Sequence, residues 1–132
     1  MNNIQSKTKA ANFEIEITSD SGHTITSDEP EKVGGKNKGM SPDELIISAL
    51  ASCTSATLKM YAQHKEWNLE GVNTSIEMIP GENKGELPHI QRTIELLGDL
   101  DEEQRGRMLV IANKCPVHKM LSGELKIESD LG

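Results

Sequence analysis

Residues 41–65 read SPDELIISALASCTSATLKMYAQHK, and this stretch decides the fold. Ser41 is a good helix N-cap, and Pro42 suits the first helical position. Asp43 and Glu44 place negative charge where the helix dipole is positive, and Ser41 and Glu44 have the spacing of a capping box. These signals predict a helix that begins at Ser41 and ends near Lys65.

The middle of this predicted helix, residues 45–58, carries no charge. A surface helix shows a charged stripe, so we expect this helix to be buried almost all round, at the centre of a domain. A membrane span needs about 20 apolar residues, whereas this run is shorter and contains several hydroxyl groups. The sequence therefore predicts a core helix that carries one thiol, Cys53.

Length and charge limit the classes of function. A chain of 132 residues is the size of one domain, so we expect a single domain over residues 1–132. The net charge of −7 argues against nucleic-acid binding, which requires a basic patch. The first residues are polar and no apolar signal segment follows them, so we expect a cytoplasmic protein with reduced thiols. Two cysteines in that compartment favour catalytic, redox or metal-binding roles.

The rest of the chain alternates between strand and helix patterns. Apolar and polar residues alternate in several segments, which predicts strands, and residues 19–22 and 81–88 connect two pairs of them as hairpins. A second helix, capped by Asp99, ends near Lys114, because Cys115-Pro116 interrupts it before one or two further turns. The predicted fold is α+β, with a long buried central helix packed on antiparallel sheet. The predicted strands are residues 12–18, 23–27, 72–79, 89–96 and 124–128.

A glycine-rich segment, residues 33–40, leads into the long helix. Glycines ahead of a helix can hold a phosphate, but this segment lacks the Gly-Lys-Ser/Thr ending of a P-loop and the spacing of a dinucleotide fingerprint. We therefore favour a flexible entry loop over a phosphate site.

The two cysteines differ in setting. Cys53 lies in the apolar helix, where an inert buried thiol and a reactive one are both open interpretations. Cys115 precedes Pro116 at a helix start, where backbone N–H groups favour the thiolate, and His118 lies one turn further along. The alternative interpretation of this segment is a helix breaker with an exposed histidine. The two cysteines can meet as attacking and resolving thiols. A mixed metal site with His118 and His64 is less favoured, since no paired ligand spacing is present.

These segments resemble the OsmC/Ohr family of small thiol peroxidases. The similarity extends over nearly the whole chain and includes features of the family's OsmC-like branch at residues 28–30 and 98–100. The paired motifs around the two cysteines are specific. The matching motifs are residues 34–35, 39–45, 49–54 and 115–118.

The resemblance implies an OsmC-like fold in an intertwined homodimer, with central helices packed against sheets built from both chains. It assigns Cys53 as the peroxidatic cysteine, which attacks an organic hydroperoxide and becomes a sulfenic acid. It assigns Cys115 as the resolving cysteine, which forms a Cys53–Cys115 disulfide that an external dithiol reduces. No metal, haem or flavin cofactor is implied, and no nucleic-acid or membrane partner.

The chain departs from the family in its activating residues. The best-studied members use an N-terminal arginine, held by a glutamate, whereas no arginine precedes Arg92 here and the cations ahead of the long helix are lysines. A lysine does not reproduce the planar fork of a guanidinium. The glutamate position falls at Asp43, with Glu44 one place later, so both are candidate site residues. Arg92 is a candidate substitute donor, and its alternative interpretation is a strand-surface residue.

A second function class stays open. The same fold can serve as a non-catalytic binding module that holds a small apolar or thiol-bearing ligand in a pocket at the dimer interface.

Overall fold

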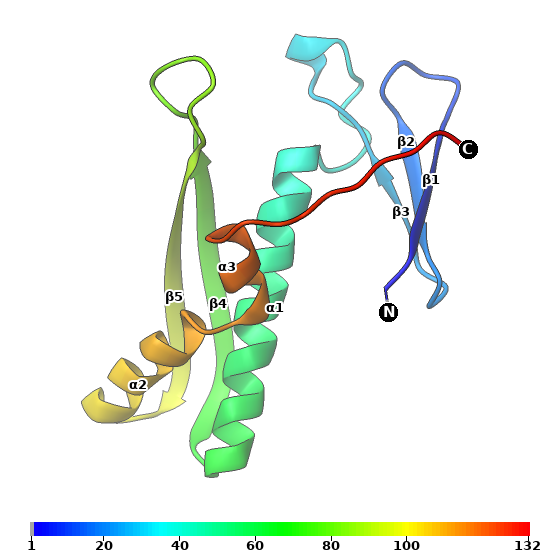
Figure 1. Cartoon of the computed structure of the whole chain (residues 1–132). Coiled ribbons are helices and arrows are strands. Elements are labelled where there is room, and N and C mark those ends of the chain that lie inside the picture. Colours follow the sequence, from blue (N-terminus) through cyan, green and yellow to red (C-terminus); the bar gives the residue numbers. More distant parts are fainter. Residues whose placement is uncertain (1) are drawn as a thin grey trace. The chain divides into compact units, whose positions relative to one another are not determined.

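The structure, a computed structural model, describes residues 2–132 and divides into two compact units (Figure 1). The N-terminal unit extends to Ile46, and the C-terminal unit comprises Ile47–Gly132. The boundary falls within the long helix α1 (Pro42–Lys65). The single domain expected from length remains a prediction.

The N-terminal unit is a three-stranded antiparallel sheet in the order β1-β2-β3. The predicted hairpin is confirmed, with Gly22 adopting the left-handed φ of 97° in its turn. β1 is not among the predicted strands, because its five residues are all exposed and show no apolar alternation. The unit's elements are β1 (Ile4–Thr8), β2 (Ile15–Ser19), β3 (Thr24–Ser27) and the 3₁₀ turn η1 (Glu31–Val33).

The glycine-rich segment is fastened by the buried carboxylate of Asp28. This carboxylate accepts hydrogen bonds from the backbone N–H groups of Glu29 at 2.8 Å, Lys36 at 3.2 Å and Lys38 at 3.2 Å. Burial raises the pKa of Asp28, but these three donors together hold it below its ordinary value. The N–H groups of Lys36 and Lys38 thus donate to Asp28 and are not free to bind a phosphate. The expected flexible loop is instead held in place by these hydrogen bonds.

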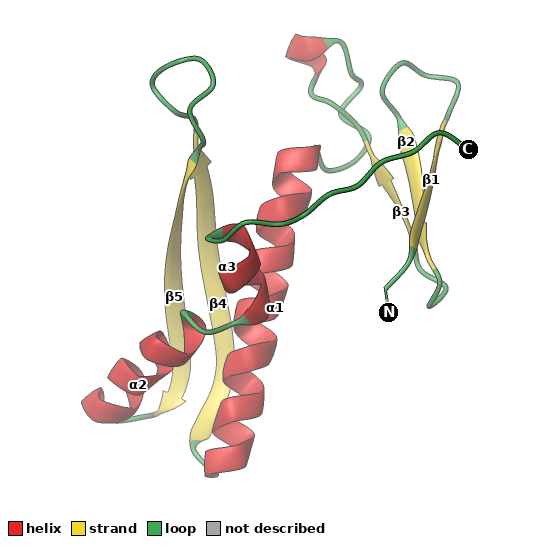
Figure 2. Cartoon of the chain, viewed as in Figure 1, coloured by secondary structure: helices red, strands yellow, loops and turns green. Residues whose placement is uncertain are grey.

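The C-terminal unit consists of the remainder of α1, a two-stranded antiparallel sheet and two shorter helices (Figure 2). The hairpin predicted for the second pair of strands is confirmed, and Ile76 lies opposite Arg92 in its register. The first of these strands begins at Asn68, within the predicted connection. The unit's further elements are β4 (Asn68–Ile79), β5 (His89–Asp99), α2 (Glu102–Ala112) and α3 (Pro116–Leu121).

The start of α1 follows the predicted capping box. The N–H of Glu44 donates to Ser41 Oγ at 3.3 Å, and the N–H of Ser41 donates to Glu44 Oε1 at 3.0 Å. By length and composition alone, α1 would also pass as a membrane-spanning helix, a property it shares with core helices of soluble proteins.

The prediction that α1 is buried almost all round is wrong for the single chain. Its fully buried residues form one stripe, with a spacing of four, because the elements that pack on it within the C-terminal unit cover one side. Ala56 and Met60, on another face, are exposed. The buried stripe consists of Leu50, Thr54, Leu58 and Ala62.

The cap of α2 is Asp101, not Asp99 as the sequence suggested. Asp101 Oδ1 accepts the N–H of Gln104 at 2.7 Å, and Gln104 Oε1 accepts the N–H of Asp101 at 2.9 Å. Asp99 is the last residue of β5 and pairs with Asn68. The capping-box spacing of Asp101 and Gln104 therefore sets the start of α2.

Residues 124–128 form no strand, which corrects the last secondary-structure prediction. Their side chains are exposed, with Leu125 62% and Ile127 83% accessible. An alternating segment becomes a strand only when its backbone pairs with a neighbouring edge, and no strand pairs with it within residues 2–132.

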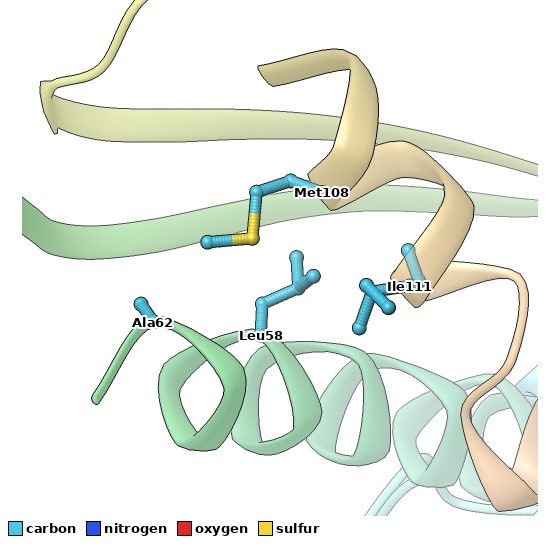
Figure 3. Packing of buried hydrophobic residues seen from close by; sticks show 5 residues of the cluster. Leu58, Ala62, Met108 and Ile111 are labelled. Carbon is cyan, nitrogen blue, oxygen red and sulfur yellow. The ribbon is translucent and has the colours of Figure 1, made fainter. Parts of the chain in front are cut away.

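The core of the C-terminal unit lies where α1 and α2 meet over the sheet. Figure 3 shows Met108 of α2 extending toward Leu58 and Ala62 of α1, with Ile111 beside them. Leu58 and Met108 are fully buried, and partly buried side chains of β4 and β5 pack against the cluster. This packing fixes α1, which carries Cys53, against the end of α2, which leads to Cys115.

We expect Leu58→Ala to lower the free energy of unfolding by about 2–5 kcal/mol, because it opens a cavity in this core. The neighbouring Lys59 is exposed, so Lys59→Ala is the matched control and changes stability by roughly 0.5 kcal/mol or less. Urea unfolding followed by circular dichroism measures both. Equal midpoints for the two variants would contradict the packing described.

Candidate thiol site

The structure brings the two cysteines together. Cys53 lies on α1 and is partly exposed, whereas Cys115 is fully buried at the N-terminal end of α3. Both are free thiols, and the Cys115 side chain lies close enough to Cys53 to lower the pKa of the Cys53 thiol. The sequence could place each cysteine on its helix, but only the packing of α1 against α2 and α3 makes them neighbours.

Local sequence explains the position of Cys115. α2 ends at the cap residue Asn113, and Pro116 then starts α3, so Cys115 takes the extended conformation of an N-cap with φ −62° and ψ 143°. Its Sγ accepts the backbone N–H of His118 at 3.3 Å. The prediction that Cys115 caps a helix is confirmed.

Four neighbours lower the pKa of Cys53. Burial alone raises the pKa of this thiol, but the nearby backbone N–H of Val117, the Cys115 thiol and the Thr57 hydroxyl each lower it. The Cys53 Sγ to Thr57 Oγ1 distance is 3.9 Å. The positive charge of Arg92 adds to these effects, so the pKa of Cys53 lies below its ordinary value. A thiol in this setting has more of the nucleophilic thiolate at neutral pH than a free cysteine.

Arg92 is the central cation of the site. From β5, its Nη1 donates to Thr54 Oγ1 at 2.9 Å and its Nη2 donates to Asn113 Oδ1 at 3.0 Å. Nη2 also lies 3.3 Å from His118 Nδ1. A guanidinium only donates, so His118 Nδ1 is the acceptor and the neutral ring carries its proton on Nε2. The interpretation of Arg92 as a strand-surface residue is therefore wrong.

His118 is held in its neutral form. Burial and the positive charge of Arg92 both lower the pKa of His118 below its ordinary value. The sequence places His118 one turn beyond Cys115. The contact that the structure shows with Cys115 comes from the His118 backbone, while the ring accepts from Arg92.

Thr54 and Asn113 belong to this site, and neither was among the predicted site residues. Thr54 is fully buried and donates its hydroxyl to the Leu50 carbonyl at 2.6 Å while it accepts from Arg92. A signal was available in the sequence. Thr54 interrupts an apolar stripe with a spacing of four, and Arg92 occupies the apolar face of its strand together with Ile94. A polar residue on each of two facing apolar surfaces indicates that the two side chains form a hydrogen bond with each other.

A cavity of about 410 Å³ adjoins the thiol site. It shares Arg92, Asn113 and His118 with that site, while none of the described residues that line it is a cysteine. The lining residues are Leu50, Pro88, His89, Ile90, Arg92, Leu109, Asn113, His118, Leu121 and Ser122.

Asp43 and Glu44 stay predicted site residues. Both lie in the first turn of α1, within the N-terminal unit, and Glu44 accepts the Ser41 N–H in the capping box. For the metal alternative, no group of three or more histidine, cysteine, aspartate or glutamate side chains suited to hold an ion occurs in the part of the chain that the structure describes.

The sequence profile of the family described as OsmC-like protein matches residues 35–130. The OsmC-like protein of Mycoplasma pneumoniae has a similar fold, with a TM-score of 0.79 and 22% identity over 93% of this chain and 88% of that one. The organic hydroperoxide resistance protein OhrB of Bacillus subtilis is similar with a TM-score of 0.64 and 22% identity, over 93% and 91% of the two chains.

The organic hydroperoxide resistance protein OsmC of Legionella pneumophila gives a TM-score of 0.71 at 15% identity, over 93% of this chain and 90% of that one. None of the curated proteins matches the chain. At these identities the solved structures establish the α+β fold, with a long helix packed on antiparallel sheet.

We expect Arg92→Met to raise the pKa of Cys53, because the variant loses the cation that stabilises the thiolate. Alkylation of Cys53 by iodoacetamide should therefore slow at neutral pH, and its rate profile should shift to higher pH. Peptide mass mapping of the labelled cysteine, across a pH series, measures this.

Arg107→Met is the matched control for this prediction, because the Arg107 guanidinium donates to the Tyr61 hydroxyl at 3.1 Å and is not among the described groups that shift the pKa of Cys53. Circular dichroism checks that both variants are folded. An unchanged profile in folded Arg92→Met would show that Arg92 does not influence the thiol.

Proposed function

Since the chain belongs to the OsmC-like protein family, we propose that it is a thiol-dependent peroxidase that reduces organic hydroperoxides. The observation that carries this proposal is the contact between two free cysteines, of which the more exposed one has a lowered pKa. A nucleophilic thiolate beside a second thiol is the arrangement that a two-cysteine peroxidase requires.

The first step oxidises Cys53. Its thiolate attacks the terminal oxygen of the hydroperoxide, an S–O bond forms and the O–O bond breaks. Cys53 becomes a sulfenic acid, and the departing alkoxide takes a proton from solvent to leave as the alcohol. The Val117 N–H, the Thr57 hydroxyl and the Arg92 charge, which stabilise the thiolate, support this step.

The second step closes a disulfide. The Cys115 sulfur attacks the sulfenic sulfur of Cys53, and one water molecule leaves with the hydroxyl and the thiol proton. An external dithiol then reduces the Cys53–Cys115 disulfide by two exchanges, which restores both thiols and releases the oxidised, cyclic dithiol. The influence of the Cys115 thiol on the pKa of Cys53 indicates that the two side chains are neighbours, and this supports direct closure.

Arg92 takes the place of the arginine that the best-studied relatives supply from an N-terminal segment. Its guanidinium reaches the site from β5 and is fixed by Thr54, Asn113 and His118. A cation held by three neutral acceptors keeps its full charge available to a thiolate. The candidates Asp43 and Glu44 remain proposed auxiliary residues of the same reaction.

We further propose that the protein is a cytoplasmic homodimer. The support for the dimer is a row of exposed, uncharged side chains on α1, in which Ala49, Ser52, Ala56 and Met60 follow one another at helical spacing. A face of small and apolar side chains on a long helix suits the close approach of a second copy.

We expect one equivalent of an organic hydroperoxide to oxidise the reduced protein with a loss of about 2 Da, the two hydrogens of a new disulfide. Intact-mass spectrometry after a dose of cumene hydroperoxide, beside an equal dose of hydrogen peroxide, measures the change. The organic substrate should react faster.

Two variants separate the steps. Cys53→Ser should abolish the rapid reaction, whereas Cys115→Ser should stop at the sulfenic acid, which dimedone traps on Cys53. If both thiols of the wild-type protein stay reduced for minutes, the peroxidase proposal is wrong, and the non-catalytic binding module remains.

We expect Ala56→Arg to convert the dimer to a monomer, because it places a charge at the centre of the exposed α1 face. Light scattering should give twice the 14.5 kDa of one chain for the wild type and the single-chain mass for the variant. Glu103→Arg, an exposed position on α2, is the control and should stay dimeric. A wild-type protein of single-chain mass would disprove the dimer.

A further inference from the structure

The cavity beside the thiol site combines an apolar wall with a positive end. Leu50, Ile90, Leu109 and Leu121 supply apolar surface, and Arg92 supplies the charge. No aspartate or glutamate is among the described residues that line it, although the chain as a whole carries a net charge of −7. Its volume of about 410 Å³ is within the range of small-molecule sites.

The charge of Arg92 has no anionic partner among the described residues. Its three hydrogen bonds go to a hydroxyl, an amide oxygen and a neutral imidazole. The three ion pairs present in residues 2–132 all involve lysines. A guanidinium has five N–H donors, so two remain beyond the three bonds described. A half-buried cation with spare donors at a cavity wall is a binding group for an anion.

We propose that this cavity binds an apolar molecule that ends in a carboxylate, with the carboxylate on Arg92 and the tail along Leu50, Leu109 and Leu121, and that its occupancy reduces the reactivity of Cys53. The binding part of this proposal is independent of peroxidase activity, since the cavity lining contains Arg92 but neither thiol.

The positive charge of Arg92 favours a ligand that ends in a carboxylate over ligands with other end groups. A cationic end would be repelled by Arg92, and a neutral end would gain no charge-assisted hydrogen bond. A bare small anion would leave the apolar wall unused, so both the charge and the tail contribute to binding.

The link to Cys53 is the shared guanidinium. The positive charge of Arg92 acts on the Cys53 thiolate. A carboxylate bound to Arg92 neutralises that charge at close range, so the thiolate loses part of its electrostatic stabilisation. A ligand bound in the cavity therefore lowers the reactivity of Cys53 through its charge alone, with no movement of the backbone.

Calorimetric titration of the reduced full chain tests binding with three probes: octanoate, its neutral counterpart octanamide, and acetate, which has no tail. We expect octanoate to bind about tenfold more tightly than octanamide, and acetate to bind far more weakly than octanoate. Octanoate, and not octanamide, should slow iodoacetamide labelling of Cys53 in proportion to occupancy.

Variants connect the result to this cavity. Arg92→Met should remove the preference for octanoate over octanamide. Leu109 lines the cavity and is 58% exposed, so replacements there should fold. Leu109→Glu should weaken octanoate binding selectively, and Leu109→Gln, its uncharged control, should affect both probes equally.

The carboxylate can belong to a separate effector or to the substrate itself, and turnover distinguishes the two sources. An effector would make octanoate inhibit reduction of the neutral tert-butyl hydroperoxide. A substrate carboxylate would give a hydroperoxy acid a lower KM than its methyl ester.

Equal binding of octanoate and octanamide, or a preference that survives Arg92→Met, would overturn the carboxylate site. Octanoate binding with unchanged labelling of Cys53 would overturn the coupling. Neither readout uses a peroxide, so failure of the peroxidase proposal would leave both measurements intact.

Discussion

The guanidinium of Arg92 is the interaction on which the thiol site depends. From β5 it reaches α1 through Thr54, the end of α2 through Asn113 and α3 through His118. Burial of a charge is costly unless its donors are satisfied, and three neutral acceptors satisfy three of them without cancelling the charge. One side chain therefore both ties together the elements that carry the cysteines and supplies the cation beside Cys53.

Much of this arrangement could be predicted because its signals are local. The capping box of Ser41 and Glu44 fixes the start of α1, and the alternation of apolar residues identifies β4 and β5 as a hairpin. Cys115 before Pro116 gives the N-cap of α3 from two adjacent residues. The two helix caps depend on hydrogen bonds between residues a few positions apart, and the hairpin follows from alternation on both sides of one polar loop, so local sequence specifies all three.

The parts that could not be predicted depend on distant partners. β1 is exposed and polar, and only its pairing with β2 makes it a strand. Residues 124–128 have the alternation of a strand, but no strand pairs with them within residues 2–132 and their side chains are exposed. The contact between Cys53 and Cys115 likewise arises from helix packing, which neither cysteine's neighbours encode. Arg92 was ambiguous because an isolated charge in a strand pattern is most often solvated.

An arginine at position 92 can both link the elements that carry the cysteines and supply a positive charge near Cys53. A lysine could do only the second. A lysine would supply the charge, but its compact ammonium cannot reach three acceptors on three elements in one plane. The flat guanidinium can, and it keeps further donors for a partner on its open side. A cation must be held in position, yet a carboxylate that held it would also neutralise it. Here three neutral acceptors hold the Arg92 guanidinium, so its positive charge still acts on the Cys53 thiol. A glutamate in place of Asn113 would hold Arg92 more firmly and would weaken its effect on Cys53 for the same reason.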